Sequence, residues 1–78
     1  MPTIRVTVYR DNKPAKGHRV VLSYSGFLTG GMSKSQYTDS HGQAFFDAKY
    51  GEEGEVYVDG KKKGRWGSYS ATDVRVGL

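Results

Sequence analysis

Cysteine is absent from this chain of 78 residues, so neither a disulfide nor a thiolate metal site can stabilise the fold. Long apolar runs are absent too, and nothing approaches the roughly 18 consecutive apolar residues of a transmembrane helix. The opening MPTIRVTVYR has an early arginine and an alternating pattern where a signal peptide has a continuous apolar stretch. We therefore expect a cytoplasmic protein without a membrane segment, folded as a single domain over residues 1–78.

Helical periodicity is also missing, because no stretch repeats its apolar residues at the helical period. Five segments alternate instead with the period of two that is typical of strands. The side chains expected to face a common core are Ile4, Val6, Val8, Val20, Leu22, Tyr24, Ala44, Phe46, Val56, Val58, Val74, Val76 and Leu78. Their neighbours, such as Arg5, Thr7 and Arg75, are expected to face away from it.

Residues typical of turns separate the alternating segments. They occur in RDNKPAKG, DSHG, YGEEG and VDGK. The Asp59–Gly60 pair predicts a two-residue hairpin of type I′, because both residue types tolerate a positive φ. Short strands at a spacing of about 8–12 residues, with turns between them, predict a sandwich or a small barrel.

Two spaced patterns carry a family resemblance. VTVYRDNKPAKGHRVVL, residues 6–22, has a strand, a turn with proline before glycine, and a second strand with V-x-L; TDSHGQAFF follows at Thr38 to Phe46. Together they resemble carboxypeptidase regulatory-like domains of the transthyretin-like (prealbumin-like) group. The resemblance implies an all-β, Ig-like or transthyretin-like sandwich of six or seven mostly antiparallel strands. An SH3-like or OB-like barrel is the alternative.

Patterns of catalytic or metal-ligating residues are missing from the sequence. The family's hydrolase branch ends in Tyr-Arg-Gly-Ser, whereas this chain ends in VRVGL, so the resemblance does not carry that activity over. Asp39 and His41 share one turn, and we interpret Asp39 as a cap of backbone amides rather than a metal ligand. Glu52 and Glu53 lie in a turn, where solvated charge is the usual state. We expect no enzymatic activity, no metal and no cofactor.

The most basic segment is VDGKKKGRWGSY, in a chain with 12 Lys and Arg against 8 Asp and Glu. One interpretation is a nucleic-acid surface made of Lys61, Lys62, Lys63, Arg65, Trp66 and Tyr69, with cations on phosphates and rings on bases. The other is a hairpin whose lysines protect an edge strand. Alternation would place Lys61, Lys63 and Arg65 on one face and Lys62, Gly64 and Trp66 on the other, with Trp66 completing the core. We favour this structural interpretation.

Two sets of apolar residues have no place in the expected core. Phe27, Leu28 and Met32 lie in the irregular segment SGFLTGGMSKS, and Tyr9, Val21, Phe45 and Tyr57 point outward if the alternation holds. Such side chains form contacts with other proteins, unless the loop folds back and covers the outward set. The sequence thus predicts a non-enzymatic module that binds another protein or a second copy of itself, with nucleic-acid binding by residues 61–69 as the alternative.

Overall fold

The computed structural model describes residues 2–24 and 31–78, which form nine β-strands and no helix. The strands are β1 (Thr3–Arg10), β2 (Lys13–Pro14), β3 (Arg19–Tyr24), β4 (Gly31–Met32), β5 (Gln36–Tyr37), β6 (Gln43–Asp47), β7 (Glu53–Val58), β8 (Lys61–Gly67) and β9 (Asp73–Gly77). β2, β4 and β5 have two residues each, and the other six strands have five to eight.

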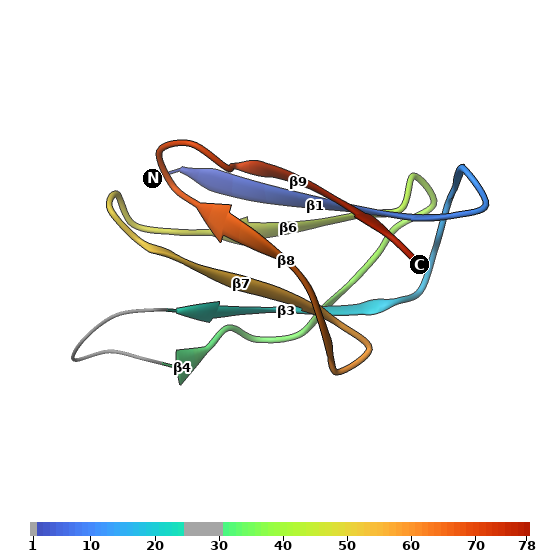
Figure 1. The fold of residues 1–78 in the computed structure, drawn as a ribbon, viewed down its shortest axis with the longest axis horizontal. Helices are drawn as coiled ribbons and strands as arrows, with labels where there is room; N and C mark the ends of the chain where they lie inside the picture. Colours follow the sequence, from blue (N-terminus) through green and yellow to red (C-terminus); the bar gives the residue numbers. More distant parts are fainter. Residues whose placement is uncertain (1, 25–30) are drawn as a thin grey trace.

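The strands form two sheets that lie face to face (Figure 1). In the first sheet, β1 pairs antiparallel with β2 and β6 and parallel with β9. In the second, β3 pairs with β4 and β5 and also with β7, which in turn pairs with β8. Among the described residues no strand pairing joins the two sheets, so the expected all-β sandwich is confirmed and the strands do not close into the alternative barrel.

Two hairpins depend on residues that accept a left-handed backbone. Asp59 and Gly60, between β7 and β8, have φ values of 53° and 83°, which confirms the expected turn with two positive φ angles. Asp11 and Asn12, between β1 and β2, adopt the same region at 53° and 64°. Asn and Asp enter this region more readily than other side chains, so both turns follow from local sequence.

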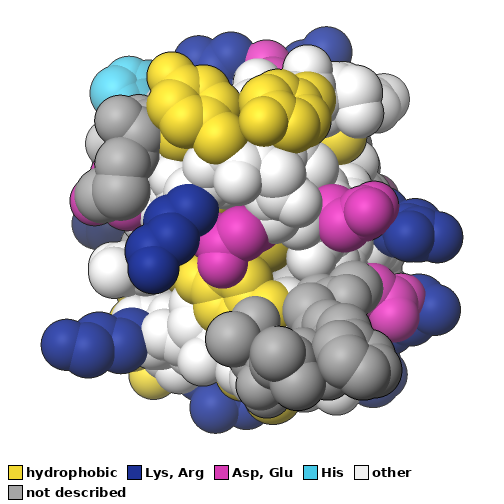
Figure 2. Space-filling model, turned by 90° about the vertical axis from the view of Figure 1, so that its left-hand side faces the viewer, with side chains coloured by type: hydrophobic (Ala, Val, Ile, Leu, Met, Phe, Trp, Pro, Cys, Tyr) yellow, Lys and Arg dark blue, Asp and Glu magenta, His cyan; other side chains and the backbone are white. Residues whose placement is uncertain are grey.

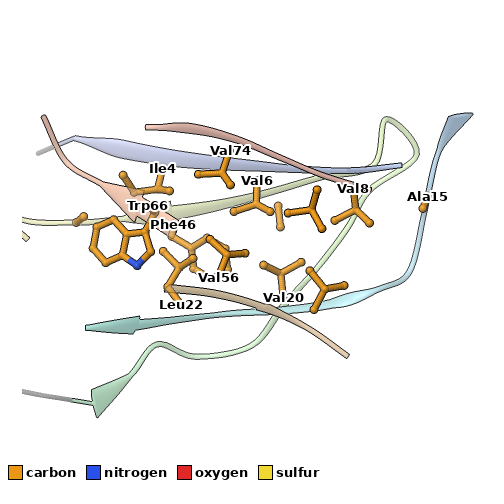
Figure 3. Close-up of a cluster of buried hydrophobic side chains, with 14 residues drawn as sticks. Ile4, Val6, Val8, Ala15, Val20, Leu22, Phe46, Val56, Trp66 and Val74 are labelled. Carbon is orange, nitrogen blue, oxygen red and sulfur yellow. The ribbon is translucent and has the colours of Figure 1, made fainter. Parts of the chain in front are cut away.

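The core lies between the sheets and consists largely of the side chains that the alternation selects (Figure 3). Tyr24 is only partly buried and packs against the core, and Leu78, also expected inside, is 39% exposed because it follows the end of β9. Thr7 was expected to be exposed but is 7% exposed, since β1 is the central strand of its sheet. Trp66 completes the core at one end, as the structural interpretation of its segment predicts.

Near Trp66, strands β3 and β7 approach each other closely. The indole Nε1–H of Trp66 donates to the carbonyl oxygen of Ser23 on β3 at 2.8 Å, and Gly54 on β7 is paired with Trp66 on β8. A Cβ on Gly54 would stand 1.8 Å from that same oxygen, so only glycine leaves room for this contact. The Tyr24 ring meets the indole edge to face, with centroids 5.5 Å apart, and burial raises the pKa of the Tyr24 hydroxyl.

Candidate functional site

The basic segment forms β8, and an irregularity in its pairing changes which side chains share a face. Tyr57 pairs with Lys62 whereas Val56 pairs with Gly64, so Lys63 is an extra residue at a β-bulge. Lys62 therefore lies on the outer face of the sheet together with Arg65. The expected grouping of Lys61, Lys63 and Arg65 is wrong, because simple alternation does not account for a bulge.

The residues of the nucleic-acid alternative do not come together as a stacking platform. Trp66 is buried and donates its only polar hydrogen to the protein, so its ring is not available to a base. Tyr69 is exposed, but it lies in the turn after β8. Lys62 Nζ forms an ion pair with Glu55 Oε2 at 2.6 Å, and this contact raises the pKa of Lys62. The remaining cations, Lys61, Lys63 and Arg65, are exposed.

The four outward apolar residues divide between the two sheets. Val21 on β3 is paired directly with Tyr57 on β7, and both are half-buried. Tyr9 and Phe45 belong to the first sheet, where Tyr9 accepts a hydrogen bond from Arg75 Nε at 2.8 Å and Phe45 is paired with Arg5. The four residues therefore form two separate surfaces, because β1 and β6 lie in one layer and β3 and β7 in the other.

One residue of the irregular segment joins the outer surface of the second sheet. Met32 on β4 pairs with Ser23 and is 60% exposed. Together with Val21 and Tyr57 it lines an open hollow of about 420 Å³, whose other lining residues are Arg19, Ser33, Ser35 and Gly60. We call Val21, Met32 and Tyr57 the Val21–Tyr57 face. Phe27 and Leu28, the other two predicted loop anchors, lie outside the described residues.

The aspartates near the histidines have structural partners. Asp39 Oδ1 accepts hydrogen bonds from the amides of His41 at 2.8 Å and Gln43 at 3.0 Å, which confirms its role as a turn cap and lowers its pKa. His18 Nδ1 lies 2.7 Å from Asp59 Oδ2, and this hydrogen bond lowers the pKa of Asp59. Among the described residues no three His, Asp or Glu side chains are grouped as metal ligands would be.

Sequence reasoning missed one aromatic pair. Tyr50, in the turn between β6 and β7, stacks on Tyr69, in the turn between β8 and β9, with ring centroids 6.1 Å apart and an angle of 22° between the planes. The rings are 69% and 76% exposed. Each turn shows a tyrosine in the sequence, but nothing local indicates that these two turns are neighbours in space.

Comparison of the chain with protein-family models and with curated proteins gives no match. The resemblance to carboxypeptidase regulatory-like domains therefore stays a prediction that rests on the quoted residues. In the part of the chain that the structure describes, no helix has the length and apolar character needed to cross a bilayer.

Proposed function

We propose that this protein is a non-enzymatic binding module of the Ig-like or transthyretin-like kind, and that its Val21–Tyr57 face contacts another protein or a second copy of the chain. The observation that carries the proposal is the direct pairing of Val21 with Tyr57 beside the exposed Met32, around one hollow. An apolar centre of this kind, with an aromatic ring and a flexible thioether, is typical of surfaces that bind proteins.

The rim of the face favours a partner with an apolar side chain next to a carboxylate. Arg19 lines the hollow and is exposed, whereas the neighbouring Lys62 is already paired with Glu55. A partner carboxylate placed at the rim would meet the Arg19 guanidinium, which forms no ion pair in the described part of the chain, while its apolar neighbour covers Tyr57. Charges in such a position mainly set orientation and association rate, and the apolar centre provides most of the affinity.

Nucleic-acid binding is less well supported, because the ring best suited to stacking, Trp66, is part of the core. The exposed cations of β8 have another use, since lysines and a bulge at a sheet edge prevent pairing with a further strand. The exposed lysines and the bulge are both explained by the protection of an edge strand, and neither requires a ligand.

The experiment is a selection of peptides from a random displayed library, followed by titration of the enriched peptides against three proteins. These are the wild type, the double variant Val21→Thr/Tyr57→Ser, and the control Phe45→Thr, which removes an exposed ring from the other sheet. We expect the double variant to weaken binding at least tenfold, which corresponds to about 1.4 kcal/mol, and the control to leave it unchanged. Equal binding by all three proteins would contradict the proposal.

A parallel titration with random-sequence single- and double-stranded nucleic acid tests the alternative. We expect weak binding at physiological salt. Micromolar affinity that falls steeply with ionic strength and is lost in Lys61→Ala/Lys62→Ala/Lys63→Ala would instead assign the function to β8.

A further inference from the structure

The stacked tyrosines lie at the end of the sandwich that carries the β6–β7 and β8–β9 turns. The structure fixes these two turns to each other, because the Ser68 amide donates to the Glu52 carbonyl at 2.9 Å. Gly67 and Ala71 exchange two further backbone hydrogen bonds, at 3.0 and 3.1 Å, which close the second turn. Figure 2 shows this end of the molecule, where hydrophobic side chains gather next to acidic ones.

The tyrosine rings are open to solvent. Gly51 has a φ of 84°, and a Cβ on this glycine would stand 4.0 Å from Tyr69 Cε2, so Gly51 lies close to the Tyr69 ring. Stacking on each other leaves Tyr50 and Tyr69 still mostly exposed. Two large rings stacked on the surface, on turns joined by backbone hydrogen bonds, form a preorganised contact area, since binding there orders little that is not already ordered.

A small hollow lies beside the Tyr69 ring. Its volume is about 180 Å³, and its lining includes Glu52, Glu53, Ser68 and Tyr69. Ser68 is 6% exposed; its hydroxyl oxygen is buried, so it does not offer an acceptor to the hollow, and it has no hydrogen-bond partner among the described residues. Glu52 uses Oε1 to accept from the Lys49 amide at 2.6 Å, and Glu53 forms no ion pair in the described part of the chain.

We propose that four residues, Tyr50, Glu52, Glu53 and Tyr69, form a binding site for the guanidinium group of an arginine in a partner protein. We call them the tyrosine-pair site. A guanidinium is flat and stacks on an aromatic face, while its N–H groups donate to carboxylates and hydroxyls. The carboxylates of Glu52 and Glu53 are acceptors of this kind. The site is separate from the Val21–Tyr57 face and goes beyond the function proposed for it.

Other ligands use this combination less well. The ammonium of a lysine is a point charge that cannot stack as a plane, and an anion would be repelled by the two carboxylates. A neutral sugar could cover a ring and donate hydroxyl hydrogens to the glutamates, but it has no positive charge to offset the two carboxylates. Arginine is the side chain that uses the rings and the carboxylates together.

The test is a titration of the ¹⁵N-labelled protein, followed by NMR, with end-blocked Gly-Arg-Gly, Gly-Lys-Gly and Gly-Glu-Gly peptides and a neutral cello-oligosaccharide. We expect the arginine peptide to bind most tightly and to move the amide signals of Gly51, Ser68 and Ser70. Replacing Tyr69→Ser or Glu53→Gln should each weaken binding about threefold, as loss of an exposed cation–π contact or one charge would.

Tyr37→Ser is the matched control, because Tyr37 is 64% exposed on β5 and lies outside the site. It should leave the affinity for the arginine peptide unchanged. Binding that is unaffected by Tyr69→Ser, equal binding of the glutamate peptide, or binding of the oligosaccharide in preference to arginine would each overturn the proposal. Because Val21→Thr/Tyr57→Ser leaves this site intact, failure here is distinguishable from failure of the proposed function.

Discussion

Replacement of Gly54 by alanine should strongly destabilise this protein. The new Cβ would stand 1.8 Å from the Ser23 carbonyl oxygen and 3.0 Å from Trp66 Nε1, whereas real Cβ contacts essentially never fall below 3.0 Å. β3 and β7 would have to separate by about 1.2 Å, in an interior that is packed as densely as an organic crystal. Gly54 has an ordinary φ, so the expected cost is steric and not conformational.

The magnitude follows from two effects. Overpacking of a core costs about 1–3 kcal/mol. Separation of the strands also breaks the 2.8 Å hydrogen bond from Trp66 Nε1 to the Ser23 carbonyl, and a buried group without its partner costs about 1–3 kcal/mol. The sum of about 2–6 kcal/mol is a large part of the free energy of unfolding of a chain this size, about 4–12 kcal/mol. The melting temperature should fall by about 4–8 °C for each kcal/mol.

Urea unfolding followed by the fluorescence of the only tryptophan, Trp66, measures this effect directly. The matched control is Gly64→Ala on the neighbouring strand β8, where a Cβ would meet Val74 Cγ1 at 3.5 Å, an ordinary van der Waals contact. We expect Gly64→Ala to change the free energy of unfolding by less than about 0.5 kcal/mol. Equal effects of the two substitutions would refute the reasoning, because the close approach at Ser23 would then not restrict position 54.

Two further predictions concern hydrogen bonds that join distant segments. Thr38→Val removes a buried hydroxyl that donates to the Ala15 carbonyl at 2.6 Å and accepts from the His18 amide at 2.9 Å. Urea titration should show that the free energy of unfolding falls by about 1–3 kcal/mol. A fall of less than about 0.5 kcal/mol would contradict this prediction. The hydrogen bond from His18 lowers the pKa of Asp59 in the folded state. This hydrogen bond therefore stabilises the folded protein above the usual aspartate pKa, and the stabilisation is lost as the pH falls through the lowered pKa of Asp59. The urea midpoint of Asp59→Asn should therefore lie below that of the wild type at pH 6 and converge with it towards pH 2; a difference independent of pH would argue against this pair.

Much of the fold could be predicted from the sequence because its determinants are local. Alternation placed Ile4, Val6 and Val8 in the core since successive side chains of any strand point to opposite faces. The Asp59–Gly60 turn was predictable for a similar reason, as a positive φ depends on the residue's own backbone and side chain. These features need no knowledge of which strands become neighbours.

Only the tertiary structure decided which side chains share a surface. Val21 and Tyr57 share a surface because β3 pairs with β7, and Phe45 is separated from them because β6 joins the other sheet. The bulge at Lys63 places Lys62 on the outer face. Gly64 beside it is a residue type that often marks a bulge, but the pairing with β7 decides which residue is left over. Tyr50 and Tyr69 meet because two turns close at the same end of the sandwich. Strand order and register depend on how the whole chain packs, whereas the period of two belongs to each strand alone.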